Sequence, residues 1–152
     1  MRRTDLLAGG RDEPDFDRVA RRFLDRLPWP AELRPVGRPR GRDESRAAES
    51  FARRFMTLLP RDAWIVALDE RGELWNSRAF ARRLEGWFGR RGGICFVIGD
   101  AQGLPPAVCE RADAMWSLSP LTFPHALVRV LVAEQLYRAA SILAGHPYHR
   151  AG

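Results

Sequence analysis

Two uninterrupted runs of apolar residues, WIVAL at 64–68 and ICFVI at 94–98, constrain the fold more than any other feature of the sequence. Apolar runs without alternation are typical of strands that are buried on both faces, as in parallel sheets. Shorter strands are expected at residues 4–8, 31–36 and 115–118, and a segment with helical spacing of apolar residues follows each strand. This order predicts an α/β fold with a mostly parallel sheet and helices on both faces.

The expected helices are bounded by proline, by glycine and by residues that can cap a helix. The first spans 15–27, before Pro28; the second runs from a cap at Asp43 or Ser45 to Pro60; the third is capped by Ser77 and ends near Gly89; the fourth spans about 105–112; the fifth runs from Pro124 to Leu143, before Gly145. A turn is expected around Gly72. With 152 residues, of which 45% are hydrophobic, we expect a single domain over residues 1–152.

The fifth helix is unusually apolar. Its polar residues form one narrow stripe of Glu134, Gln135, Arg138 and Ser141, and apolar residues occupy most of the remaining circumference. Such a helix is covered on more than one side. At ~1.5 Å per residue its roughly 20 residues span about 30 Å, the width of a small domain. We therefore expect a second copy of the chain to supply the cover, in a homodimer.

The charge of the chain favours phosphate as a partner. Its 25 basic residues are all arginine and exceed the 19 acidic residues, which gives a net charge of +6. The guanidinium fork binds phosphate bidentately, so nucleic acid is a candidate partner, and a merely solvated face is the alternative. The arginines expected to contact phosphate lie on a helix face and in a loop: Arg18, Arg21, Arg22, Arg38, Arg40 and Arg42.

Several kinds of protein are disfavoured. The sequence has neither a signal-peptide core nor eighteen consecutive apolar residues. Cys95 and Cys109 lack CxxC spacing and are expected to be free thiols in a reducing compartment, so a cytoplasmic protein without membrane association is expected. His146 and His149 supply too few ligands for a metal site, and no metal is expected.

Ligands of an open parallel sheet bind at the carboxyl ends of its strands. Three such ends stand out, at residues 68–69, 99–103 and 118–123, and they enclose one pocket if the strands are neighbours. The last end leads into the N-terminus of the long helix, which favours an anionic group. No Gly-x-Gly-x-x-Gly, Gly-Lys-Ser/Thr or Ser-His-Asp pattern is readable. The residues alone therefore predict a nucleotide-like pocket in a basic α/β domain.

Residues 116–150 read WSLSPLTFPHALVRVLVAEQLYRAASILAGHPYHR. This segment resembles the C-terminal signature of the RlmH family, whose members typically read WSLS-x-LT-x-PH-x-LVRV-L-x-EQ-LYRA and finish NHPYHR. They are SPOUT-class enzymes that methylate a pseudouridine of large-subunit ribosomal RNA. FVIGDAQGL at 96–104 is similar to the family's IGG-x-x-GL loop, and IVALDERGELWNS at 65–77 is similar to its LD-x-x-G-x-x-W-S segment. The resemblance covers nearly the whole chain and weakens before about Asp62.

The resemblance implies a cofactor, S-adenosylmethionine, and a deep C-terminal trefoil knot that binds it largely through backbone groups. A knot departs from the rule that chains do not thread loops, so this expectation rests on the resemblance alone. Read from the residues alone, Gly99 marks a tight turn, and Leu118 and Leu121 pack in the core. Carried over to this sequence, the cofactor-binding residues are Leu68, Gly99, Leu118, Ser119, Pro120, Leu121, Thr122 and Phe123.

The tail HPYHR at 146–150 resembles the family's target-recognition end. Tyr148 can stack on an unpaired base, Arg150 can pair with phosphate, and His149 can exchange a proton near neutral pH. The reaction that the resemblance implies is methylation of N3 of a pseudouridine in large-subunit (23S) rRNA, and that nitrogen must lose its proton. His149 and Arg150, with Tyr148, are therefore the catalytic candidates, and His125 is the alternative.

The chain departs from the family pattern in one loop. The family commonly has Gly-Gly-x-Glu/Asp-Gly where residues 99–103 here read GDAQG. A side chain at Asp100 is expected to crowd the ligand or to require a conformation that glycine adopts more easily, and Pro120, where the family often has alanine, to stiffen the neighbouring loop. We expect a homodimeric methyltransferase acting on the ribosome. The alternatives are a non-catalytic ribosome-binding or assembly protein that retains the fold, and a methyltransferase for another RNA.

Overall fold

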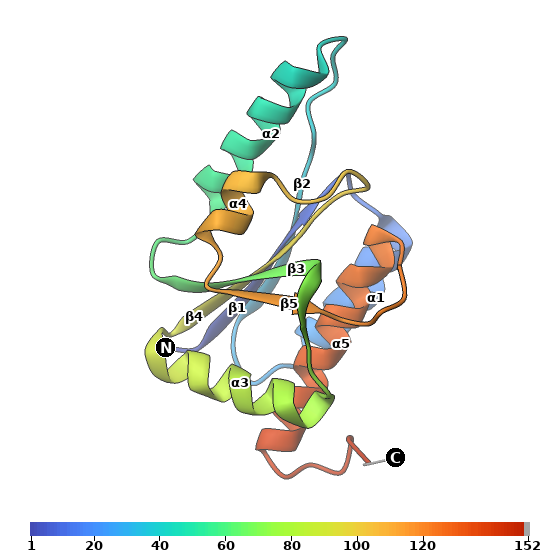
Figure 1. Cartoon of the computed structure of the whole chain (residues 1–152). Coiled ribbons are helices and arrows are strands. Elements are labelled where there is room, and N and C mark those ends of the chain that lie inside the picture. Colours follow the sequence, from blue (N-terminus) through green and yellow to red (C-terminus); the bar gives the residue numbers. More distant parts are fainter. Residues whose placement is uncertain (151–152) are drawn as a thin grey trace.

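The computed structural model describes residues 1–150, which form a five-stranded sheet and five helices (Figure 1). The elements are β1 (Arg3–Gly9), α1 (Pro14–Leu24), β2 (Ala31–Val36), α2 (Glu44–Leu58), β3 (Ala63–Leu74), α3 (Ser77–Arg90), β4 (Gly93–Ile98), α4 (Pro106–Arg111), β5 (Ala114–Ser117) and α5 (His125–Leu143). The strand order is β2-β1-β4-β3-β5, and all neighbours are parallel. The predicted α/β fold is confirmed, although α1 ends at Leu24 instead of residue 27.

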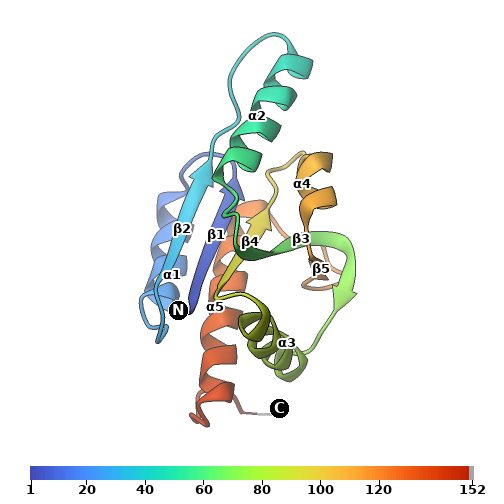
Figure 2. The same ribbon diagram turned by 90° about the vertical axis from the view of Figure 1, so that its left-hand side faces the viewer.

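Helices cover both faces of the sheet, as predicted (Figure 2). Successive strand residues point to opposite faces. In β1, Leu6 and Ala8 pack in a core with α1, α3 and α5, whereas Leu7 packs with α2 and α4 on the other face. The first core contains the stacked rings of Phe80 and Trp116, whose centroids lie 4.3 Å apart. Burial on both faces explains why the central strands do not alternate apolar and polar residues.

The strand β3 continues to Leu74, where the sequence predicted a turn around Gly72. It pairs with β5 in two registers, separated by an irregularity between Leu68 and Glu73. At Gly72 the two backbones pass so close that an added Cβ would lie 2.6 Å from the carbonyl carbon of Met115. Because Leu68 and Glu73 both pair with Trp116, residues 69–72 leave the ladder at the predicted turn, and Gly72 also permits the close approach of the two strands.

At the N-termini of two helices, the structure shows which of two candidate polar residues caps the helix. Asp43 caps α2, and its carboxylate accepts a hydrogen bond from the backbone N–H of Ser45 at 3.0 Å. Asn76, and not the predicted Ser77, caps α3 by accepting from the backbone N–H three residues further on, at 2.8 Å. The hydroxyl of Ser77 instead donates to Gln135 of α5 at 2.7 Å. This contact joins the start of α3 to the side of α5.

The long helix α5 lies between α1 and α3 and packs against both. No residue of α5 is fully exposed. Its apolar circumference is therefore largely covered within one chain, so that feature does not by itself require the predicted second copy. None of the described helices is long and apolar enough to cross a membrane.

A buried ion pair joins α5 to α1. The side chains of Arg129 and Asp17 are 0% and 1% exposed, and Nη1 of Arg129 lies 2.9 Å from a carboxylate oxygen of Asp17. The Nη2 atom of Arg129 donates to the carbonyl oxygens of Gly9 and Arg11, both at 3.1 Å. A buried charge needs such partners. The pair thereby fixes the loop after β1 against the first half of α5.

Candidate functional site

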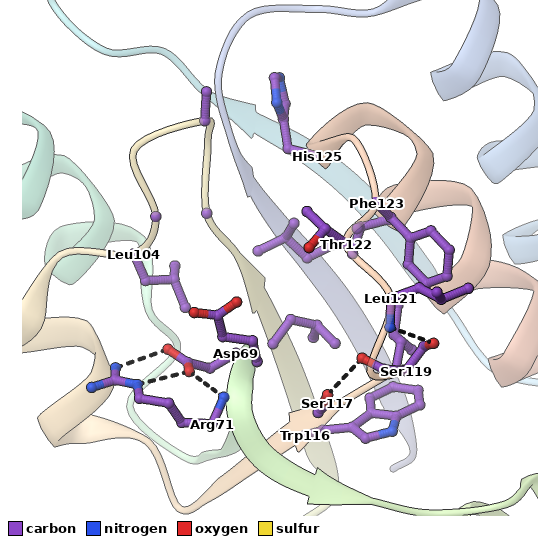
Figure 3. Close-up of a pocket in the computed structure, with 18 of the residues that line it drawn as sticks. Asp69, Arg71, Leu104, Trp116, Ser117, Ser119, Leu121, Thr122, Phe123 and His125 are labelled. Atoms are coloured by element: carbon purple, nitrogen blue, oxygen red, sulfur yellow. Dashed lines mark hydrogen bonds and ion pairs between the residues drawn. The ribbon is translucent and has the colours of Figure 1, made fainter.

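Segments 68–71, 98–104 and 116–123, together with His125 and Val128, enclose a cavity of about 1000 Å³ (Figure 3). The prediction that three strand ends meet in one pocket is confirmed. All eight residues that the sequence analysis assigned to cofactor binding line this cavity: Leu68, Gly99, Leu118, Ser119, Pro120, Leu121, Thr122 and Phe123. Their assignment to a cofactor remains a prediction.

The β4–α4 loop forms one wall of the cavity. Gly103 has a φ of +88°, and a Cβ on Gly99 would lie 2.5 Å from the carbonyl carbon of Gly103, so the loop needs glycine at both positions. The carbonyl oxygen of Asp100 accepts from the N–H of Gly103 at 2.8 Å, and its carboxylate accepts from the N–H of Gln102 at 2.9 Å. Asp100 has no positive φ, so the conformation expected to require glycine is not needed there.

The β5–α5 loop forms the opposite wall. The hydroxyl of Ser117 donates to the carbonyl oxygen of Ser119 at 3.2 Å, and the hydroxyl of Ser119 accepts from the N–H of Leu121 at 3.0 Å (Figure 3). Leu121 is 71% exposed although it lines the cavity. The alternative interpretation of Leu121 as a core residue was therefore wrong. The loop leads into α5, whose first N–H groups have no intrahelical partner.

Asp69 and Arg71 form a charged pair on the rim of the cavity, and the sequence indicated only Asp69. Arg71 donates from its backbone N–H and its Nε to one carboxylate oxygen of Asp69, at 2.8 and 2.9 Å (Figure 3). The hydrogen bond from the Arg71 side chain lowers the pKa of Asp69, and burial opposes this change. Asp69 thus keeps its negative charge at the cavity. Arg71 carried no sequence signal apart from its place two residues after Asp69.

The tail does not contribute to the cavity of its own chain. Tyr148, His149 and Arg150 are absent from the cavity lining, and the first two contact α5 near its C-terminal end. Arg138, which contacts His149, lies about 20 Å along the helix from His125. Figure 1 shows the tail at the end of α5 remote from the β5–α5 loop. Of the residues considered for proton transfer, only His125 lines the cavity.

Polar side chains of α5 hold the tail. Glu134 accepts from Arg138 at 2.8 Å and from the hydroxyl of Tyr148 at 2.9 Å. Burial, and then the bond to Glu134, raises the pKa of Tyr148. The Nη1 atom of Arg138 lies 3.1 Å from Nδ1 of His149. Because arginine can only donate, Nδ1 accepts, and the neutral ring carries its proton on Nε2.

The arginines expected to contact phosphate divide into two groups. Arg38 pairs with Asp100, Arg21 donates to the carbonyl oxygen of Leu33, and Arg18 lies 3.5 Å from a carboxylate oxygen of Asp15, so these three have partners within the chain. All of the six except Arg38 are exposed: Arg18, Arg21, Arg22, Arg40 and Arg42. Within residues 1–150, no group of three or more His, Cys, Asp or Glu residues could hold a metal ion.

Comparison with protein families places almost the whole chain in one group. Residues 1–149 match the family model described as "Predicted SPOUT methyltransferase". Among curated proteins, the chain is 45% identical over 152 residues to Ribosomal RNA large subunit methyltransferase H of Stenotrophomonas maltophilia, covering 96% of this chain and 97% of that protein. It is 42% identical to the protein of the same name from Thioalkalivibrio sulfidiphilus, covering 97% and 99% of the two chains.

Solved structures share the fold at lower identity. A probable methyltransferase from Bordetella pertussis is 19% identical, with a TM-score of 0.63 over 91% of this chain and 96% of that chain. A probable methylase family protein from Haemophilus influenzae is 13% identical, with a TM-score of 0.59 over 98% of this chain and 70% of that chain. At these identities the likeness supports the fold alone.

Proposed function

The chain belongs to the family of predicted SPOUT methyltransferases, and from this premise we propose that it transfers a methyl group from S-adenosylmethionine to N3 of a pseudouridine in large-subunit ribosomal RNA. The observation that carries the proposal is the 45% identity, over 96% of the chain, to a protein named for large-subunit rRNA methylation. The choice of pseudouridine, of N3 and of the cofactor follows from the RlmH-like motifs in the sequence.

The cavity suits a nucleoside cofactor. Its volume of about 1000 Å³ lies at the upper end of the range for small-ligand sites. Gly99 and Gly103 permit the tight β4–α4 loop that forms one wall, and the N-terminus of α5 offers N–H groups. Leu68, Gly99 and the β5–α5 loop would hold S-adenosylmethionine, which supplies a methyl group on a sulfonium sulfur. The trefoil knot implied by the family is part of this proposal.

The tail would act in the pocket of a partner subunit. Its distance from the cavity of its own chain leaves a second copy as the source of the catalytic side chains, and this is our main reason to propose a homodimer. An apolar surface is available for the contact. Phe16 and Val19 of α1 are 40% and 38% exposed, and Leu127, Val130 and Leu131 of α5 are half-buried. A C2 contact would bury these apolar residues and cross the two copies of α5, while Arg18 and Arg22 of α1 would stay outside the contact.

In the proposed site, which combines the cavity of one subunit with the tail of the other, each side chain would have its own role. The target nitrogen gains the methyl group and gives up its proton, and negative charge develops on the two flanking carbonyl oxygens. His149, held at Nδ1 by Arg138, presents an N–H that can stabilise one of these oxygens, and Arg150 supplies a cation. Tyr148 would stack on the base. His125, which lines the cavity, then becomes the candidate that accepts the proton.

RNA would contact the exposed arginines of α1 and of the β2–α2 loop. Arg18, Arg22, Arg40 and Arg42 are exposed and lie outside the cavity, which suits sequence-independent phosphate contacts. The β2–α2 loop and the start of α2 project beyond the sheet (Figure 1). This projecting segment would reach RNA that lies outside the pocket.

Calorimetric titration with S-adenosylmethionine, followed by nucleoside mass spectrometry of treated ribosomes, tests the proposal. Binding in the micromolar range and a methylated pseudouridine in large-subunit rRNA support the enzyme. Absence of heat at millimolar ligand would instead support a ribosome-binding protein that retains the fold, for which the altered GDAQG loop at 99–103 is the motivating observation. Binding with modification of a different RNA would support the second alternative.

A further inference from the structure

An ion pair connects the cofactor loop to the β2–α2 loop. The Nε and Nη2 atoms of Arg38 lie 2.8 and 3.2 Å from the two carboxylate oxygens of Asp100, across 62 residues of sequence. The two side chains are only 21% and 12% exposed. Bidentate, partly buried pairs of this kind fix geometry more firmly than exposed pairs. The pair therefore holds the two loops in one relative position.

Both ends of the pair are anchored. The guanidinium of Arg38 lies over the ring of Phe51, 4.2 Å from its centroid, and Phe51 is 1% exposed. Its neighbour Gly37 accepts a hydrogen bond from Arg54 of α2 at 3.0 Å. The carboxylate of Asp100 also accepts from the N–H of Gln102 inside the cofactor loop. The contact thus runs from the buried side of α2 to the turn that lines the cavity.

We propose that Arg38 is a positioning residue for the cofactor, because it holds the loop 99–103 in its binding conformation through Asp100. This inference rests on the proposed function. The RlmH-like pattern has glycine at position 100, which has no side chain to anchor, so the arrangement is a property of this chain. The hydrogen bond to Asp100 raises the pKa of Arg38. The altered loop is then a rebuilt cofactor site and not a degraded one.

A double-mutant cycle read by calorimetry with S-adenosylmethionine tests the inference. Arg38→Ala should weaken cofactor binding at least about fivefold in the parent chain, a coupling of ordinary size. In an Asp100→Gly background, which restores the family's residue, the same change should have no further effect. In methylation assays of Arg38→Ala, the KM for cofactor should change more than kcat. Arg38→Lys should recover only part of the affinity, because lysine lacks the fork.

Arg46→Ala is the matched control, because it removes an exposed ion pair with Asp43 at the end of the same loop without touching Arg38 or Asp100, and it should leave cofactor affinity unchanged. Asp100→Asn serves if Arg38→Ala fails to fold, since the amide oxygen can still accept from Gln102, and it should weaken binding to a similar extent. Equal affinity of the parent and Arg38→Ala, or equal losses in both backgrounds, overturns the inference alone. A parent protein that binds no cofactor overturns the proposed function and this inference with it.

Discussion

The two ends of α5 carry the two halves of the proposed site, and they are built differently. At the start of the helix, three loops of one chain enclose the cavity, and their shape depends on glycines and backbone hydrogen bonds. At its end, Glu134 and Arg138 hold Tyr148 and His149 through a few side-chain contacts. Sheet topology thus determines the cofactor half, whereas the catalytic half depends on local polar contacts and, in our proposal, on a second subunit.

Deletion of residues 148–152 separates the two halves most sharply. Methylation of ribosomes should fall by at least ~10²-fold, because the stacking ring, the imidazole and a cation are removed together. Cofactor affinity measured by calorimetry should stay close to that of the full chain, since these residues do not line its cavity. A truncated protein that stays folded and dimeric and methylates at the parent rate would rule out a catalytic tail. His125→Ala would then be the variant to test.

Mixing a tail-deleted variant with a variant of weakened cofactor affinity, at a cofactor concentration too low to load the weakened cavity, tests whether the halves come from different subunits. Tail-deleted subunits supply an intact cavity, and Gly99→Ala subunits supply an intact tail. Random exchange should restore roughly a quarter of the parent activity, because half of the dimers are mixed and each of these has one complete site. Sedimentation should give about twice the 17.3 kDa chain mass. A monomer, or mixing without recovery, contradicts the shared site.

The change Gly99→Ala alters the cofactor half alone. The added Cβ would lie 2.5 Å from the carbonyl carbon of Gly103, so the loop has to shift. Calorimetry should show cofactor affinity about tenfold weaker, the lower part of the range for overpacking. Gly86→Ala is the control, because a Cβ there meets nothing within 4 Å. Unchanged affinity in Gly99→Ala would remove this loop from the proposed cofactor site.

The substitution Arg138→Ala tests whether the contacts of α5 with the tail set the tautomer of His149. Loss of the bond to Nδ1 of His149 should leave the tautomer of the neutral ring mixed, which nitrogen-15 NMR of labelled histidine detects. Methylation should fall several-fold, up to about tenfold, less than after deletion because the tail is retained. Cofactor affinity should not change. An unaltered His149 spectrum would show that Arg138 does not set the tautomer.

Much of the fold and of the cavity could be predicted from local sequence. The runs at 64–68 and 94–98 require burial on both faces, and parallel strands bring their carboxyl ends to one edge of the sheet, so the lining followed from strand order. The errors came from contacts between distant segments. The continuation of β3 beyond Gly72 depends on the backbone of β5 passing beside it, and Asp100 reads as a defect unless Arg38 is known to reach it.

Prediction of the helix caps and of the position of the tail was limited by a different ambiguity. Asn76 and Ser77 can both cap a helix, and only the partner of Ser77 on α5 decides between them. The residue types of the tail indicate stacking and proton exchange, but no local pattern indicates where the tail lies relative to the cavity. Its position depends on the length of α5, which carries the tail away from the cavity of its own chain.

The ion pair of Arg129 and Asp17 has a consequence for how the chain folds during its synthesis. Its partners are 112 residues apart, so the first strand and helix leave the ribosome long before the helix that neutralises Asp17. Until α5 arrives, burial of Asp17 would leave its charge unpaired, which is costly. The N-terminal segments therefore cannot complete their packing during synthesis, and the contact that closes the fold comes last. Non-local closure of this kind is expected to make folding slow and dependent on a complete α5.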